Sequence, residues 1–346
     1  MDDLDKRLLN RIQSNFPVVV RPYQALADAF GTTEQDVLER FSKLRADHVI
    51  RQVSAIFDTK SLGYKSSLVA MKIPADRLAA GAQIINSHPG VTHNYERNHE
   101  YNLWFTIGVP PTSDLEAVVQ RLHELAGAET TRVMYTLKLF KIGVTLDMTG
   151  DRPADAQSKP EYGESDRARA RGGVLSEADQ ALVRELQHDL PVTAHPFLEM
   201  ANRLGVDEEA VITAINNLRE RGFLRRVAGI LYHRKAGFKA NGMGVWAVPE
   251  DRVEEVGSRM AEFTAVSHCY RRPTYPDWPY NVFSMVHGRS VEECEDVFKA
   301  ISQKTGITDY TSLYSTREYK KTRLMFYTPD YAEWEARYMP TPVPAS

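Results

Sequence analysis

The sequence consists of two copies of one pattern, and this repeat constrains the fold more than any other feature. Asp5 of the first copy recurs as Asp179 and Gly31 recurs as Gly205, both 174 residues later. Further along, the spacing between matching residues grows to 175 and then 179, so the second copy carries a short insertion. Residues 149–173, which join the copies, are rich in Asp, Arg, Gly, Pro, Ala and Ser. This composition predicts an exposed linker between two copies of one fold.

Charge and cysteine content exclude several classes of protein. The chain has 43 Lys and Arg against 46 Asp and Glu, so it is not a polycationic protein that coats DNA. Its two cysteines, Cys269 and Cys294, are too few for a disulfide framework or a cysteine-based zinc site. No apolar run approaches the roughly 20 residues that cross a bilayer, and the acidic N-terminus does not resemble a signal peptide. We expect a reduced, cytoplasmic protein that does not associate with membranes.

Each copy begins with a predicted helix-turn-helix. Its second helix ends at Gly31 or Gly205, because glycine suits the left-handed position after a helix. Its third helix begins after Thr33 or Asp207, which are good N-caps. A short Gly-containing turn between two helices is typical of this motif. We place the helix-turn-helix domains at residues 1–58 and 174–232, each ending in a short wing strand at residues 49–53 and 224–227.

The remainder of each copy alternates strands and helices. In the first copy we predict strands at 67–73, 91–97, 103–109 and 131–144, with helices at 75–87 and 114–126. This β-α-β-β-α-β order predicts a ferredoxin-like domain. The fold class is therefore α+β, a tandem duplication that forms an internal pseudo-dimer; association of whole chains stays open. The ferredoxin-like domains are placed at 59–148 and 233–330, followed by a C-terminal tail at 331–346.

This domain order resembles the Lrp/AsnC family of amino-acid-responsive regulators, over nearly all of both copies. The resemblance implies DNA binding, for which Arg40, Lys43 and Arg45 are candidates. However, the third helices begin with carboxylates such as Glu34 and Glu208, which repel phosphates where a DNA reader must approach them. We therefore expect no DNA recognition, and keep an Lrp/AsnC-type transcriptional regulator, responsive to an amino acid or to haem, as the alternative.

The same spacing of histidine, tyrosine and arginine occurs once in each copy. The residues are His93, Tyr95 and Arg97 in the first copy and His268, Tyr270 and Arg272 in the second. In a strand these alternate positions share one face, where they could bind and protonate a carboxylate. Each residue alone could instead be structural, with Arg97 paired to Glu96 or Glu100. The repetition favours a functional role.

These blocks, His93 to Asn102 and His268 to Phe283, also resemble the two subunit types of the sirohaem decarboxylases, which occur as separate subunits or as natural fusions. The resemblance implies loss of carbon dioxide from the acetate groups at positions 12 and 18 of sirohaem. The product would be 12,18-didecarboxysirohaem, used for haem or for the d-type haem of nitrite reductase. No Gly-rich phosphate loop or zinc-like cluster occurs, so we expect a non-oxidative lyase without a cofactor, with iron present only in the substrate.

Residues of the expected site fall into three groups. His93 and His268 are the first candidates for the proton donor and His99 is the third, with Tyr95 and Tyr270 orienting them. A histidine could instead be an axial ligand of the substrate iron, and His287 could line the sheet or be structural. The candidate carboxylate clamps are Arg97, Arg271, Arg272, Lys138, Lys141, Arg317 and Lys320. The candidate apolar walls are Trp104, Phe105, Trp278, Tyr280 and Phe283. Which half catalyses stays open.

Overall fold

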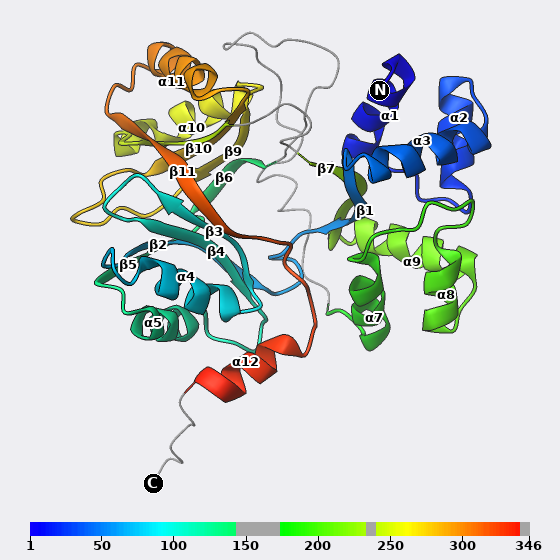
Figure 1. The fold of residues 1–346 in the computed structure, drawn as a ribbon, viewed down its shortest axis with the longest axis horizontal. Helices are drawn as coiled ribbons and strands as arrows, with labels where there is room; N and C mark the ends of the chain where they lie inside the picture. Colours follow the sequence, from blue (N-terminus) through cyan, green and yellow to red (C-terminus); the bar gives the residue numbers. More distant parts are fainter. Residues whose placement is uncertain (143–173, 233–239, 340–346) are drawn as a thin grey trace. The chain divides into compact units, whose positions relative to one another are not determined.

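The computed structural model describes residues 1–142, 174–232 and 240–339, which form two compact units (Figure 1). Unit 1 contains both helix-turn-helix domains, and unit 2 contains both ferredoxin-like domains. Equivalent domains of the two copies thus associate with each other. The expected linker at 149–173 lies outside the described residues. Within the three described stretches, no helix combines the length and apolar character needed to span a bilayer.

Unit 1 confirms the predicted caps. Its helices are α1 (Asp3–Ser14), α2 (Pro22–Phe30), α3 (Glu34–Ala46), α7 (Glu177–Leu186), α8 (Leu198–Leu204) and α9 (Glu208–Glu220). The Thr33 and Asp207 side chains accept hydrogen bonds from main-chain N–H groups of α3 and α9. Gly31 and Gly205 adopt φ of 70° and 69°, which favours glycine.

The wing strands are longer than predicted because they pair with each other. β1 (Ile50–Phe57) and β7 (Leu224–Leu231) form an antiparallel two-stranded sheet, with Ala55 opposite Val227. Each strand satisfies main-chain hydrogen bonds of the other, so neither ends after the four or five residues expected of an isolated wing. Unit 1 is therefore a pseudo-dimer as well.

Unit 2 has the predicted β-α-β-β-α-β order in both halves. The first half comprises β2 (Lys65–Lys72), α4 (Leu78–Ser87), β3 (Val91–Arg97), β4 (Leu103–Val109), α5 (Leu115–Ala126), β5 (Thr130–Met134) and β6 (Lys138–Ile142). The second comprises β8 (Ala240–Trp246), the 3₁₀ helix η1 (Glu250–Arg252), α10 (Val253–Glu262), β9 (Val266–Arg271), β10 (Val282–Gly288), α11 (Val291–Thr305), β11 (Tyr310–Lys321) and α12 (Asp330–Tyr338).

The last strand of each half crosses to the other half. The nine strands pair in the order β5-β2-β4-β3-β11-β8-β10-β9-β6. The beginning of β11 pairs with β8 of its own half and its end pairs with β3 of the first half. The single strand predicted at 131–144 is two strands, because β5 pairs with β2 whereas β6 pairs with β9 of the second half. This exchange confirms the internal pseudo-dimer.

Helices cover one face of each half-sheet, and the opposite face carries a third core. α4 and α5 pack on the first half and α10 and α11 on the second, each over a cluster of buried apolar side chains. The third cluster draws side chains from both halves, among them Trp104, Met134, Trp278 and Leu313. It joins the halves on the face that carries the repeated histidines.

Residues 331–338 of the expected C-terminal tail belong to a helix that packs on the first half. These residues form α12, whose Trp334 is buried in the core of the first half. The Trp334 ring lies 4.5 Å from the buried His88 ring, measured between centroids. Burial lowers the pKa of His88 to about 3, so this histidine is a neutral packing partner of α12.

Candidate functional site

Two matching clusters lie on the face of the sheet opposite the helices. The His93 cluster consists of His93, Tyr95 and Arg97 on β3 and at its end, and the His268 cluster of His268, Tyr270 and Arg272 on β9 and just after it. The alternate residues of β3 and β9, which lie between the histidine and the tyrosine of each cluster, point to the helices. Asn94 donates to the Ala82 carbonyl of α4 at 3.2 Å, and Cys269 Sγ lies 3.7 Å from the Gly257 carbonyl of α10. Strand alternation therefore places each histidine, tyrosine and arginine on one face, as predicted.

Each histidine is held by the hydroxyl residue that precedes it. Thr92 Oγ1 lies 3.0 Å from Nδ1 of His93, and Ser267 Oγ lies 2.9 Å from Nδ1 of His268. In both clusters the histidine and tyrosine ring centroids are 6.1 Å apart. Thr92 and Ser267 are not among the residues predicted for the site, although a hydroxyl residue precedes the histidine in both copies. These contacts orient the imidazole rings.

Each arginine is buried and is held by the opposite half. Arg97 and Arg272 are 6% and 7% exposed. Arg97 Nη1 donates to the Leu313 carbonyl at 2.9 Å, and Arg272 Nη1 donates to the Met134 carbonyl. Leu313 and Met134 are equivalent positions of the repeat. The alternative pairing of Arg97 with a neighbouring carboxylate is wrong, because Glu96 accepts from Tyr319 and Glu100 pairs with Lys72.

The guanidinium groups of both clusters suit an anionic ligand. Within the described residues, Nε of Arg97 and Nε of Arg272 are buried without a hydrogen-bond partner. Burial lowers the pKa of each arginine to about 10, so both stay charged near neutral pH. A buried charge whose donors are not all used is costly. A carboxylate in this place would use those donors and neutralise the charge.

Aromatic side chains flank both clusters. Trp104 lies in register beside Tyr95, and Phe283 lies in register beside Tyr270. Trp278, 1% exposed, packs 5.3 Å from Trp104 and 6.1 Å from Phe283 between ring centroids. Tyr280 packs on Trp278 at 5.2 Å. The expected walls therefore come together, except Phe105, which lies in the helix-facing core.

The insertion of the second copy fastens Trp278 to the first half. Asp277 forms two 3.0 Å hydrogen bonds with Arg132 of β5 and accepts another from the Tyr101 hydroxyl. These bonds lower the pKa of Asp277 to about 2. Tyr275 donates to the Val133 carbonyl at 2.7 Å. The insertion is visible in the sequence, but no role is predicted for Arg132, Tyr101 or Asp277, because nothing local indicates a contact between distant segments.

Three expected clamps lie on the other face of the sheet. Arg271 pairs with Glu250 of η1, and Lys138 pairs with Glu254 of α10. Arg317 lies in register with Glu96, and its guanidinium stacks 4.8 Å from the Tyr319 ring. Adjacent strand residues point to opposite faces, so Arg271 cannot join Arg272. The structure therefore does not bring these three cations to the histidines.

Two further lysines bind helix ends. Lys141 Nζ donates to the Phe263 carbonyl after α10 at 2.8 Å. Its equivalent, Lys320, donates to the Asn86 and His88 carbonyls at the end of α4, at 2.8 and 3.2 Å. A cation at a helix C-terminus stabilises the unpaired carbonyls there. Both lysines thus lie away from the clusters.

The remaining histidines occupy different surroundings. His99 Nδ1 accepts from the Tyr101 N–H at 3.0 Å, and its ring packs on Trp278 at 5.3 Å. Burial lowers the pKa of His99, which favours the neutral ring. His287 Nδ1 lies 2.5 Å from Asn241 Oδ1 across the β8–β10 pair. Neither histidine belongs to the repeated histidine, tyrosine and arginine pattern of the two clusters.

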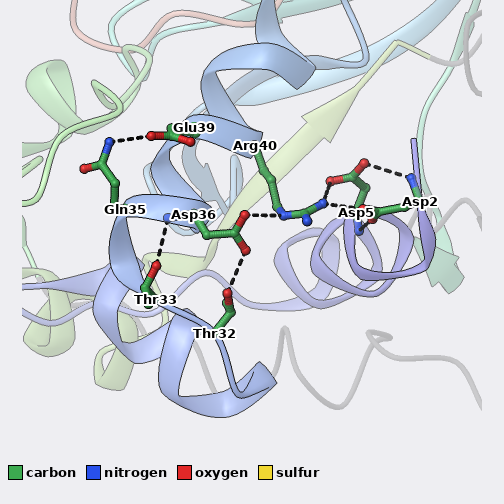
Figure 2. Close-up of polar contacts among 8 residues, drawn as sticks. All are labelled: Asp2, Asp5, Thr32, Thr33, Gln35, Asp36, Glu39 and Arg40. Carbon is green, nitrogen blue, oxygen red and sulfur yellow. Dashed lines mark hydrogen bonds and ion pairs between the residues drawn. The ribbon is translucent and has the colours of Figure 1, made fainter.

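The helix-turn-helix domains offer little positive charge at α3. Figure 2 shows Arg40 of α3 surrounded by carboxylates. It pairs with Asp2, Asp5 and Asp36 at 2.7, 2.8 and 2.9 Å. Asp36 also accepts from Thr32 at 2.6 Å. Two of the three expected DNA-contacting cations are engaged within the domain pair, since Arg45 binds Asp189 at 2.7 Å.

Comparison with known families defines the class of this protein. The AsnC-like ligand binding domain model matches residues 61–141 and 235–320. The model of the Siroheme decarboxylase NirDL-like HTH domain matches residues 5–51 and 179–225. The chain is therefore a duplicated AsnC-like ligand-binding protein with a helix-turn-helix domain in each copy.

Similar full-length proteins give the family. A siroheme decarboxylase of Hydrogenobacter thermophilus is 40% identical, over 96% of this chain and 97% of that protein. A crystal structure of the siroheme decarboxylase NirDL in complex with an iron-uroporphyrin III analogue superposes with a TM-score of 0.76, at 35% identity, over 98% of this chain and 99% of that one. The siroheme decarboxylase beta subunit of Methanosarcina barkeri matches 43% of this chain over 97% of its own length, at 47% identity. The chain belongs to the sirohaem decarboxylase family and contains two subunit-like halves.

Proposed function

We propose that this chain removes carbon dioxide from the acetate groups at positions 12 and 18 of sirohaem and releases 12,18-didecarboxysirohaem for haem or d-type haem synthesis. The observation that carries the proposal is the pair of buried arginines, each with unused donors, each beside a tyrosine and each on the same strand face as a histidine. A buried cation with free donors is suited to a carboxylate. The complex of NirDL with an iron-uroporphyrin III analogue supports a tetrapyrrole of this type as the substrate.

In each cluster the arginine and the histidine act at different steps of the reaction. The arginine holds the acetate carboxylate while the bond between the carboxyl carbon and the methylene carbon breaks and carbon dioxide leaves. The electron pair stays on the methylene carbon and is delocalised into the conjugated pyrrole ring. The histidine then donates a proton to that carbon, leaving a methyl group. One proton is consumed for each carbon dioxide released, and the reaction needs neither an oxidant nor a cofactor; the iron belongs to the substrate.

Thr92 and Ser267 support the histidines in this role. A hydroxyl bonded to Nδ1 fixes the ring so that Nε2 is the nitrogen that transfers the proton. Axial ligation of the substrate iron by the same Nε2 is the competing role for either histidine. The absorption spectrum of bound iron uroporphyrin separates the two roles, because loss of an axial imidazole changes the spectrum and loss of a proton donor does not.

Product analysis tests the proposal. The protein is incubated with sirohaem without oxygen, and the tetrapyrrole is examined by mass spectrometry. We expect loss of two carbon dioxide molecules, and we expect His93→Ala and His268→Ala each to stop or interrupt the reaction. His195→Ala is the matched control, because His195 is exposed in unit 1 and pairs with Glu208. Unchanged sirohaem with the unmodified protein, or full activity in both cluster variants, would contradict the proposal.

We also propose that the helix-turn-helix domains do not read DNA. The carboxylates at the start of α3 and the ion pairs of Arg40 and Arg45 support this proposal. Fluorescence anisotropy with labelled duplex DNA at low salt provides the test. We expect no saturable binding, with or without iron uroporphyrin. Sequence-specific binding that weakens steeply with salt would favour the regulator instead.

A further inference from the structure

The exchanged strands place different side chains beside the two clusters. On β11, Lys321 lies in register with His93 and Glu318 with Tyr95. At the equivalent positions of β6, Ile142 lies in register with His268 and Leu139 with Tyr270. Residues that are directly opposite in an antiparallel pair project from the same face. The His93 cluster therefore has a charged neighbouring strand where the His268 cluster has an apolar one.

Two contacts fix the direction of Lys321. The preceding Lys320 points to the helices, where its Nζ binds the end of α4. The following Thr322 N–H donates to the Thr92 carbonyl at 2.7 Å, which holds β11 against β3 just beyond His93. A strand residue between these two points must project to the face that carries His93. Lys321 is partly exposed, so its ammonium group can reach a ligand on that face.

We propose that Lys321 binds a peripheral carboxylate of the tetrapyrrole, one that is not lost, and so directs the carboxylate-rich edge of the macrocycle to the His93 cluster. This inference rests on the proposed function, because it takes a polycarboxylate tetrapyrrole as the ligand. The His93 cluster offers two cations, Arg97 and Lys321, on one face of the sheet. The His268 cluster offers only Arg272, because Ile142, which lies in register with His268, cannot bind an anion. Lys321 is in this way a specificity-determining residue, and the repeated clusters are unequal.

Glu318 should oppose the binding of negatively charged ligand groups on the face of the sheet that carries His93. It is exposed and projects from the same face of β11 as Lys321, two register positions away. A carboxylate there repels the carboxylates of a ligand and attracts the lysine. Removal of this charge by Glu318→Gln should therefore strengthen the binding of a polycarboxylate, opposite to the effect of removing Lys321.

Binding titrations with two iron porphyrins test the inference. Iron uroporphyrin III carries many carboxylates and iron protoporphyrin IX carries two, so their comparison isolates the carboxylate contacts. Lys321→Met should weaken the binding of iron uroporphyrin by about tenfold or more, the size of one charge-assisted contact. Its affinity for iron protoporphyrin should change by less than about threefold. Ile142→Met is the matched control, because it places the same side chain at the equivalent position, and it should leave both affinities unchanged.

The outcomes separate this inference from the proposed function. Equal affinities in Lys321→Met and the unmodified protein, or equal weakening in Ile142→Met, would overturn the inference even if sirohaem is decarboxylated. A selective loss in Lys321→Met would support it even if no carbon dioxide is released, since the titration does not require turnover. Circular dichroism verifies folding, which we expect to be retained because methionine preserves most of the lysine stem.

Discussion

Replacement of Arg97 by methionine should weaken the binding of iron uroporphyrin without destabilising the protein. Most substitutions of a buried, hydrogen-bonded residue are destabilising. Arg97 differs because burial lowers its pKa from 12.5 to about 10. A pKa shift of one unit corresponds to about 1.4 kcal/mol, so keeping this guanidinium charged costs the folded protein about 3 kcal/mol. That cost is present at every pH below 10 and decreases as the pH rises above it, where the folded protein releases the proton before the unfolded chain does.

Methionine removes this cost together with one hydrogen bond. The bond from Arg97 Nη1 to the Leu313 carbonyl is worth about 1.5–3 kcal/mol, because its donor is charged. The free energy of unfolding of Arg97→Met should therefore be unchanged or higher by up to about 1.5 kcal/mol, as for buried charges replaced by apolar groups elsewhere. The affinity for iron uroporphyrin should fall by about 10- to 100-fold, because a charge-assisted bond to a carboxylate is worth about 1.5–3 kcal/mol.

Urea unfolding followed by tryptophan fluorescence measures the effect in the right part of the molecule. All four tryptophans of the chain, Trp104, Trp246, Trp278 and Trp334, lie in unit 2. Arg271→Met is the matched control, because Arg271 precedes Arg272, the counterpart of Arg97 in the second half, but points to the helices and pairs with Glu250 at the surface. It should change stability by less than about 1 kcal/mol and leave porphyrin binding intact. A loss of more than 2 kcal/mol in Arg97→Met with undiminished porphyrin affinity would refute the reasoning.

Three further substitutions test the packing and polar contacts around the clusters. Asp277→Asn should lower the stability of unit 2 at neutral pH by only about 1 kcal/mol, since Asp277 is partly exposed. The difference in stability from the unmodified protein should vanish as the pH falls from about 4 to 2, because the carboxyl group of Asp277 has a pKa of about 2 in the folded protein. Gly257→Ala should destabilise by about 1–3 kcal/mol in thermal unfolding, since its Cβ would lie 2.3 Å from the Phe140 ring. Thr92→Val should lower kcat about fivefold with little change in KM, because it removes one hydrogen bond that orients His93. An effect on KM alone would instead indicate that Thr92 acts in substrate binding.

Local patterns predicted the elements well and the contacts between distant segments poorly. The strands at 91–97 and 103–109 have the predicted bounds, because their alternation and flanking turns are local signals. The prediction that β5 and β6 are one strand was wrong, because β6 continues only by pairing with a strand of the other half. No property of residues 135–137 taken alone indicates that the strand changes partners there.

The candidate site was predicted in part for the same reason. Alternation within one strand correctly grouped His93, Tyr95 and Arg97 on one face. The grouping of Arg271 with Arg272 ignored that alternation and failed. The support that the clusters receive from Leu313 and Asp277 comes from the opposite half, and only the fold reveals such contacts.

The strand exchange also has a consequence for how the chain is made. While a ribosome has produced only the first half, β3 and β6 lack the neighbours that they later obtain from β11 and β9. Each is then an open sheet edge with unpaired main-chain groups, which invites pairing with another nascent chain. The partners of these strands are encoded far downstream, so unit 2 has a high contact order and should fold slowly. Its folding should be completed only after β11, near the end of the chain, has been synthesised.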